Sequence, residues 1–123
     1  MKSIIWDIAH LAHVELLTSK LDESTRFFTE IMGMSISDIK GDSVYLRAYD
    51  DYEHHTLKLT AHKHNGMAHF AWRTRTPEAL EERAKAIEKT GRGIGWHDGD
   101  LGHGKTYAFQ MPDGHNEIGR AHV

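Results

Sequence analysis

The chain has 123 residues, of which 39% are hydrophobic and 27% are charged, a composition typical of one soluble globular domain. The formal net charge of −3 gives no basic surface, so we expect no nucleic-acid partner. The chain has no cysteine, no apolar run long enough to cross a membrane and no signal-peptide core near its start, and we therefore expect a cytoplasmic protein without membrane contact.

The first half of the chain predicts a strand, a helix and three further strands. The leading strand is expected over residues 4–17 and the helix over residues 21–32. Within the helix, Phe28, Ile31 and Met32 recur at helical spacing and form an apolar stripe. The three further strands are expected over residues 35–39, 43–48 and 55–61.

The second half repeats this order after a polar linker. A strand is expected over residues 67–74, and a helix begins at Thr76 and Pro77, which suit the N-cap and the first turn. Gly91 ends that helix. Residues 98–104 form a glycine-rich loop without the spacing of a phosphate-binding loop. The remaining strands are expected over residues 93–97, 105–111 and from about 115.

The two halves resemble each other in sequence as well as in element order. Residues 12–18 and 68–74 carry alanine, histidine and threonine at matching places. We therefore interpret the chain as one domain over residues 1–123, built from two modules over about 4–62 and 66–118. The fold class is expected to be α+β, with one helix to each module.

Strand alternation assigns side chains to the two faces of the sheet, and the helices cover only one of them. The side chains expected beneath the helices are Val14, Leu16, Phe70 and Trp72. The side chains expected on the open face are His13, Glu15, His69 and Arg73. Because His13 and His69 stand at matching places in the two modules, we expect them to point toward one shared axis.

These two histidines suggest a metal centre. Neutral imidazole is the commonest protein ligand of catalytic transition metals. Two histidines and one carboxylate on one face of an ion leave positions open for substrate and oxygen, which is the ligand set of non-haem Fe(II) oxygenases. Glu117, just after the turn over residues 112–114, is the candidate carboxylate. We expect Fe(II) as the cofactor, and Mn(II) would also suit such a site.

The chain resembles the vicinal oxygen chelate superfamily, which includes glyoxalase I, bleomycin-resistance proteins and type I extradiol dioxygenases. The likeness is greatest to the N-terminal domain of extradiol dioxygenases of the catechol 2,3-dioxygenase type. It covers nearly the whole chain, and the ordered set of motifs is more specific than any single one. The stretches that carry it are Ala9–Leu17, Ile31–Met34, Asp42–Ala48, Gly66–Trp72, Gly99–Gly104 and Pro112–His115.

The resemblance implies a fold and a ligand set. The family fold is a pair of βαβββ modules that form a U-shaped, partly closed mixed sheet, with helices on its outer face and a metal inside. By resemblance, His13 and His69 take the ligand positions at the start of each module. Glyoxalase I has a fourth protein ligand at the end of its first module, whereas Thr56–Thr60 contains no acid here, which favours the dioxygenase pattern.

Two features depart from the catalytic pattern of that family. Glu117 follows Gly114 by three residues, whereas the family's ligand glutamate usually follows that glycine by four. A one-residue slip turns a strand side chain to the opposite face. In addition, the N-terminal domain of the two-domain dioxygenases is usually metal-free, so a metal-free cavity is the alternative expectation for this chain.

Two further residues are candidates for catalysis. His103, in the glycine-rich loop, is a candidate acid or base beside the metal, and Tyr107 is a candidate hydrogen-bond donor to substrate. The alternatives are that His103 is an ordinary loop residue and that Tyr107 is an aromatic residue packed in its strand. The histidines expected at the surface or in loops are His10, His54, His55, His62, His64 and His122.

The C-terminal tail over residues 117–123 is expected to be non-native. Residues 118–123 can be back-translated as ATCGGAAGAGCACACGTC, which is sequencing-adapter sequence. We therefore hypothesise that the gene came from a truncated read and that the native sequence stops at or near Asn116. A full-length gene recovered with the same tail would contradict this.

Three functions fit the sequence. The first is an Fe(II)-dependent extradiol dioxygenase domain that opens catecholic aromatic rings. The second is a metal-free, dimeric ligand-binding module of the bleomycin-resistance type, and the third is a non-catalytic half-domain that supports a catalytic partner. Because sheet edges are exposed where such modules meet, we expect a homodimer, with exchange of strands or modules as one form of it.

Overall fold

The structure, a computed structural model, describes residues 6–50, 54–98 and 105–121. The chain forms two compact units, which we name the central unit (His13–Phe70) and the flanking unit (Met1–Ala12 with Ala71–Val123). Strands β1 (Ile8–Thr18) and β5 (Gly66–Thr74) run through both units. The two modules expected over residues 4–62 and 66–118 stay a prediction.

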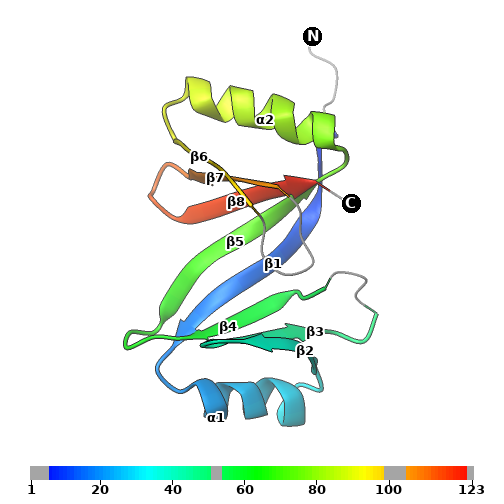
Figure 1. Cartoon of the computed structure of the whole chain (residues 1–123), viewed down its shortest axis with the longest axis vertical. Helices are drawn as coiled ribbons and strands as arrows, with labels where there is room; N and C mark the ends of the chain where they lie inside the picture. The colour runs from blue at the N-terminus through cyan, green and yellow to red at the C-terminus, as the bar shows by residue number, and fades with distance from the viewer. Residues whose placement is uncertain (1–5, 51–53, 99–104, 122–123) are drawn as a thin grey trace. The chain divides into compact units, whose positions relative to one another are not determined.

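The other elements follow the expected order along the chain (Figure 1). They are α1 (Leu21–Arg26), β2 (Ser35–Lys40), β3 (Ser43–Arg47), β4 (Leu57–Ala61), α2 (Pro77–Lys89), β6 (Gly93–His97), β7 (Thr106–Gln110) and β8 (Asn116–Ala121). The strands form one mixed sheet in the order β2-β3-β4-β1-β5-β8-β7-β6. β1 pairs with β4 in parallel, whereas β2–β3, β3–β4, β6–β7 and β7–β8 are antiparallel. The α+β class with a mixed sheet is confirmed.

The core of the central unit lies between its sheet and α1. Its buried residues come from β3 and β4, and Val14 and Leu16 of β1 pack against them together with Phe28. The placement of Val14 and Leu16 beneath the helix is therefore as expected from strand alternation. The fully enclosed members of this core are Val44, Leu46, Leu57 and Leu59.

The first helix differs from the expected one in its second half. After Arg26 the chain continues as a π-helical turn over Phe27–Ile31, closed by a 3.0 Å hydrogen bond from the Met32 amide to the Phe27 carbonyl. The wider turn rotates the side chains that follow it, so Ile31 and Met32 are 73% and 59% exposed. The expectation of a continuous apolar stripe was therefore wrong for these two residues.

The flanking unit has its own core beneath α2. The Thr76 hydroxyl accepts a hydrogen bond of 3.0 Å from the Ala79 amide and caps the N-terminus of this helix, with Pro77 in its first turn, as expected. Leu80 and Ala84 of α2 pack with Tyr107 of β7. Gly91 follows the helix with a positive φ of 79°, a conformation that glycine adopts without strain.

The last strand extends into the tail expected to be non-native. β8 pairs with β7 from Asn116 to Arg120, and both Glu117 and Arg120 are buried. The non-native origin of the tail stays a prediction. No helix in the described part of the chain combines the length and the apolar character that a membrane crossing requires.

Candidate metal centre

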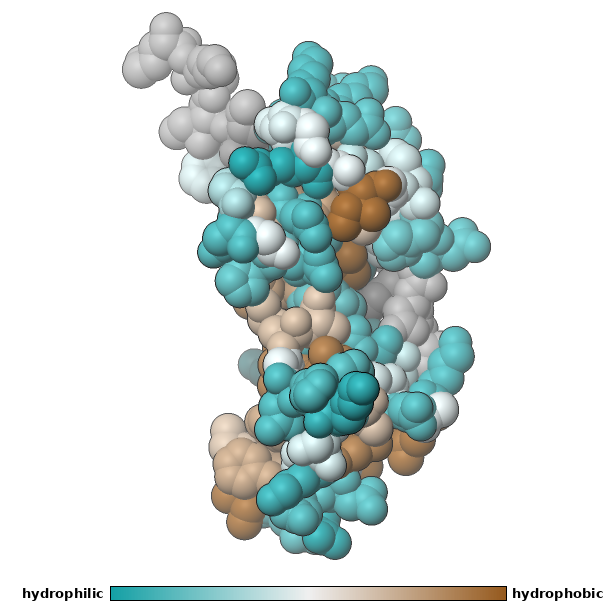
Figure 2. Space-filling model, turned by 90° about the vertical axis from the view of Figure 1, so that its left-hand side faces the viewer, coloured by the Kyte–Doolittle hydropathy of each residue, from teal (hydrophilic) through white to brown (hydrophobic). Residues whose placement is uncertain are grey.

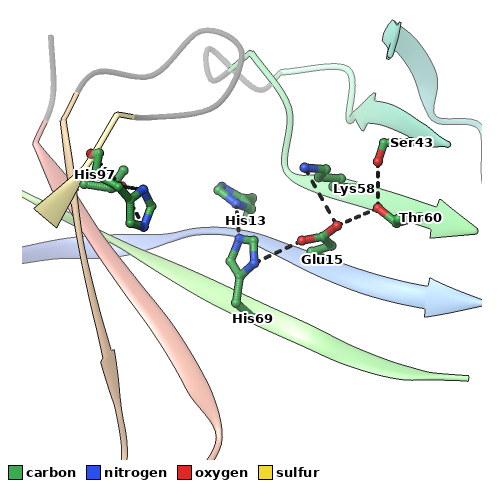
Figure 3. Close-up of polar contacts among 8 residues, drawn as sticks. His13, Glu15, Ser43, Lys58, Thr60, His69 and His97 are labelled. Atoms are coloured by element: carbon green, nitrogen blue, oxygen red, sulfur yellow. Dashed lines mark hydrogen bonds and ion pairs between the residues drawn. The ribbon is translucent and has the colours of Figure 1, made fainter. Parts of the chain in front are cut away.

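The two histidines selected from the sequence repeat lie in the central unit and point at each other (Figure 3). His13 comes from β1 and His69 from β5, and their Nε2 atoms are 3.0 Å apart. His13 is only 3% exposed, and the two rings are nearly perpendicular, with an interplanar angle of 81°. The structure therefore brings this pair together as expected.

The distance between the two Nε2 atoms suits a shared metal ion. Two nitrogen ligands that each lie about 2.1 Å from one ion, at right angles to each other, are separated by about 3 Å. The observed separation of 3.0 Å equals that value. Imidazole nitrogen also suits Fe and Zn, so these two donors and their spacing are compatible with an ion of the kind that the sequence implies.

Glu15 contacts Nδ1 of His69, the ring nitrogen that does not face His13. Its Oε1 lies 3.1 Å from Nδ1 of His69, and its Oε2 accepts a hydrogen bond of 2.5 Å from the hydroxyl of Thr60 on β4. The ammonium of Lys58 lies 3.7 Å from the same Oε2. A carboxylate behind a histidine is the usual second partner of a metal-ligating imidazole.

These contacts keep the Glu15 carboxyl ionised. Burial alone would raise its pKa, because it disfavours the charged form. The hydrogen bonds from His69 and Thr60, and the positive charge of Lys58, outweigh burial and lower the pKa of Glu15 below its ordinary value. At neutral pH the carboxylate is therefore an acceptor for the Nδ1–H of His69.

The support behind Glu15 extends across three strands. Glu15 stands opposite Lys58 in the parallel register of β1 and β4. Thr60 stands opposite Ser43 in the antiparallel register of β3 and β4, and their hydroxyl oxygens are 2.8 Å apart. The chain of contacts from His69 through Glu15 and Thr60 to Ser43 is therefore built on strands, which position side chains rigidly.

Two histidines that the sequence assigned to the surface or to loops belong to this region. His55 lies in the loop before β4, which agrees with the expectation of a surface or loop position, but it is 0% exposed. Its ring centroid lies 4.6 Å from that of His13, and its Nδ1 lies 3.0 Å from Nδ1 of His54. In the strand expected over residues 55–61, His55 alternates in step with Leu57 and Leu59, which are buried, a signal by which the sequence could have identified it.

Glu117, the expected carboxylate ligand, lies in the flanking unit. Its Oε1 accepts a hydrogen bond of 2.7 Å from the indole N–H of Trp72, and in the register of β7 and β8 it stands opposite Phe109. Opposed residues of an antiparallel pair share a face, and Phe109 packs in the core beneath α2. Glu117 is therefore on the helix-covered face of β8, as a one-residue slip would place it, and its role as a ligand stays a prediction.

The other candidates occupy different surroundings. Tyr107 is 1% exposed in the core beneath α2, where burial raises the pKa of its phenol, as do the charge of Glu88 and a hydrogen bond with it. Arg73 is buried in the flanking unit. His103 lies outside the described residues. The catalytic roles of Tyr107 and His103 stay predictions.

The described part of the chain contains no group of three or more histidine, aspartate and glutamate side chains placed to hold a metal ion together. The central unit brings together two candidate ligands, His13 and His69. It also has a shallow cavity of about 390 Å³ lined by Leu16, Thr18 and Phe28, beside α1.

Two known proteins are similar in sequence to most of this chain. Metapyrocatechase of Geobacillus stearothermophilus is 55% identical over 111 residues, which are 90% of this chain and 34% of that protein. A manganese-dependent 2,3-dihydroxybiphenyl 1,2-dioxygenase of Geobacillus genomosp. 3 is 38% identical over 111 residues, 89% of this chain and 35% of that protein. The chain therefore spans about a third of the length of these relatives.

Solved structures share the fold. Homoprotocatechuate 2,3-dioxygenase of Brevibacterium fuscum superposes with a TM-score of 0.88 at 24% identity, over 95% of this chain and 37% of that one. The enzyme of the same name from Arthrobacter globiformis gives a TM-score of 0.89 at 21% identity, over 96% of this chain and 37% of that one. The sequence pattern of one protein family matches residues 10–116, which make up most of the chain. This chain belongs to the Glyoxalase/Bleomycin resistance protein/Dioxygenase superfamily.

Proposed function

We propose that this chain is a metal-binding domain of the extradiol dioxygenase kind, which serves the opening of catecholic aromatic rings. The observation that carries the proposal is the pair of Nε2 atoms of His13 and His69, 3.0 Å apart, with the Glu15 carboxylate behind His69. The similarity to metapyrocatechase supports the same reaction class. Fe(II) is the proposed metal, and the manganese-dependent relative supports Mn(II) as the alternative.

Each residue of the central unit has a defined part in this proposal. His13 and His69 bind the ion through Nε2, and Glu15 orients His69. The His55 ring packs against His13, with centroids 4.6 Å apart, and the Tyr45 ring packs in turn against His55, with centroids 4.7 Å apart. When bound, the metal would supply a Lewis-acid and redox centre for the reaction of O2 with a catechol. The proposal rests on the two histidines and does not depend on Glu117, which lies in the flanking unit.

Metal content tests this function directly. After anaerobic loading with Fe(II) and desalting, we expect near one iron per chain in the unaltered protein and almost none in His13→Ala or His69→Ala. A loaded protein that also consumes oxygen when a catechol is added would support the dioxygenase assignment. Full iron content in both alanine variants would contradict the two-histidine centre, whatever the activity.

A metal-free binding module is the second candidate, and one observation favours it. At 3.0 Å the two Nε2 atoms are also within hydrogen-bond distance of each other, so the pair is stable without an ion. This candidate predicts that catechols bind the chelator-treated protein, with heat measured by calorimetry, and that His13→Ala weakens binding without any change in metal content. A non-catalytic half-domain predicts neither metal nor ligand.

Three further expectations remain predictions. They are the small aromatic ligand, the cytoplasmic location and the homodimer. The first is tested by the calorimetry described above, and the last by the light-scattering measurement described in the Discussion.

A further inference from the structure

We propose that the cavity beside α1 in the central unit binds small carboxylic acids that have an apolar body, of which benzoate is a simple representative. The proposal goes beyond the proposed function, because the cavity is a different site. Leu16, which lines it, packs in the core beneath α1, whereas His13 alternates to the opposite face of β1. Binding at this cavity requires no metal ion.

The cavity lies where two parallel strands end. β1 and β4 pair in parallel as far as Thr18 and Ala61. Thr18 lines the cavity together with Ser19 and Lys20, which connect β1 to α1. The crevice beyond the carboxyl ends of parallel strands is a common ligand position in sheets that helices cover. The volume of about 390 Å³ lies within the range of roughly 300 to 1,000 Å³ that is usual for small-molecule sites.

The inner wall of the cavity is apolar. It is formed by Leu16, Phe28 and Leu59, all of which belong to the core beneath α1. Leu59 is buried, whereas Leu16 and Phe28 are half-buried and so retain apolar surface that a ligand can cover. Because removal of apolar surface from water is favourable, this wall suits the ring or hydrocarbon part of a small molecule.

The rim of the cavity carries an oriented amide. Oδ1 of Asn65 accepts hydrogen bonds of 2.9 Å from the backbone N–H of Ser19 and of 3.1 Å from its hydroxyl. Because a backbone N–H can only donate, this contact identifies which amide atom is the oxygen and fixes Nδ2 on the other side. Among residues 6–50, 54–98 and 105–121, none accepts from Nδ2. Asn65 therefore offers two N–H donors to a ligand.

The same rim is positively charged. The backbone N–H of Lys20 donates to the hydroxyl of Thr18 at 3.0 Å, which holds Lys20 at the edge of the cavity. In the part of the chain that the structure describes, its ammonium has no carboxylate partner, and no acid belongs to the cavity lining. A ligand carboxylate would therefore meet amide donors and a positive charge without a repelling carboxylate, and hydrogen bonds that involve ionised groups are the stronger ones.

The test is a titration of chelator-treated protein with benzoate, followed in ¹H–¹⁵N spectra. We expect the backbone amide signals of Thr18, Asn65 and Gly66 to shift, with a dissociation constant on the order of 1 mM for so small a ligand. Benzyl alcohol is the matched control ligand, since it has a ring of the same size and no charge. We expect it to bind about fivefold more weakly.

Two variants remove the two donors one at a time. Lys20→Met keeps a long apolar side chain without the ammonium, and we expect benzoate to bind it about fivefold more weakly. Asn65→Asp keeps an acceptor for Ser19 but replaces both N–H donors by a negative charge, and we expect it to lose benzoate binding. Lys63→Met is the control, because Lys63 is exposed nearby and does not line the cavity. Circular dichroism confirms folding, and Lys20→Met carries the test if Asn65→Asp does not fold.

The outcomes separate this proposal from the proposed function. Shifts at the cavity amides that both variants weaken, and that Lys63→Met leaves unchanged, support the proposal. It is overturned if benzoate on the order of 10 mM gives no shift, if benzoate and benzyl alcohol bind equally, or if the shifts are confined to His13 and His69. None of these results depends on the iron content of the histidine variants, so each proposal can fail alone.

Discussion

His13 and His69 are two of eleven histidines, and their neighbours distinguish them from the rest. Their rings meet through Nε2, whereas the exposed His115 ring is paired with the exposed carboxylate of Asp113. An exposed pair of this kind contributes little to stability, and the His115 contact lowers the pKa of Asp113. A carboxylate fixed behind the ring therefore distinguishes the proposed ligand His69 from such a surface histidine.

The buried phenol of Tyr107 predicts an alkaline limit to stability. Because its pKa is raised in the folded state, the folded protein holds the phenolic proton more tightly than the unfolded chain does. This contribution is fully present below the ordinary pKa of tyrosine, about 10, and is lost as the pH rises through the higher folded value. We expect the free energy of unfolding to fall above about pH 10, and to fall less in Tyr107→Phe. Urea unfolding at pH 8 and pH 11 measures it, and equal losses in both proteins would contradict the prediction.

At the scale of elements, the strands were easier to predict than the helix ends. Period-two alternation identified β1 and β5 and the side of each that carries its histidine. The parity of Leu57 and Leu59 could have added His55. The π-helical turn could not have been predicted, because Ile31 and Met32 fit an α-helical stripe equally well, and the extra width of the turn is decided by tertiary packing.

The cap of α2 gives a prediction for an element. Thr76→Ala removes the hydroxyl that accepts from the Ala79 amide at 3.0 Å, and leaves that donor at the helix start without its side-chain acceptor. We expect a loss of about 1 kcal/mol in the free energy of unfolding. Chemical denaturation measures the loss. Thr76→Ser is the matched control, since it keeps the hydroxyl and should remain close to the unaltered protein.

At the scale of the whole molecule, the family and the order of elements could be predicted from the sequence, but contacts between strands could not. The alternation placed Glu15 on the same face as His13, yet its contact with Nδ1 of His69 depends on how β1 and β5 lie together, which no pattern within either strand specifies. The same holds for Glu117, whose face follows from the register of β7 and β8.

Exposed apolar residues of the central unit agree with the expected homodimer. Figure 2 shows apolar side chains at the surface around α1, where Phe27 is 49% and Ile31 is 73% exposed. β2 is an edge strand of the sheet, and its Ile36 and Ile39 are 45% and 62% exposed. Edge strands and apolar patches are common sites of association.

A charge at the exposed edge tests the homodimer. We expect the unaltered protein to have the mass of a dimer in light scattering at high concentration, and Ile39→Lys to shift it toward the monomer, because a lysine on an edge strand opposes pairing with a second strand. The control is Lys40→Arg, which keeps the charge of its exposed neighbour. A monomeric unaltered protein, or a variant that remains fully dimeric, would contradict this prediction.

The π-helical turn over Phe27–Ile31 also bears on how this chain can change in length. Such a turn holds one residue more than an α-helical turn of the same span. A deletion of a single residue within it can therefore be absorbed by conversion to an ordinary α-turn, with Phe28 still packed on the core and the following strand still in register. The same deletion inside β1 would invert every later side chain of that strand. Natural length variation in proteins of this kind should accordingly be concentrated at this turn, and spared in the strands that carry the two histidines.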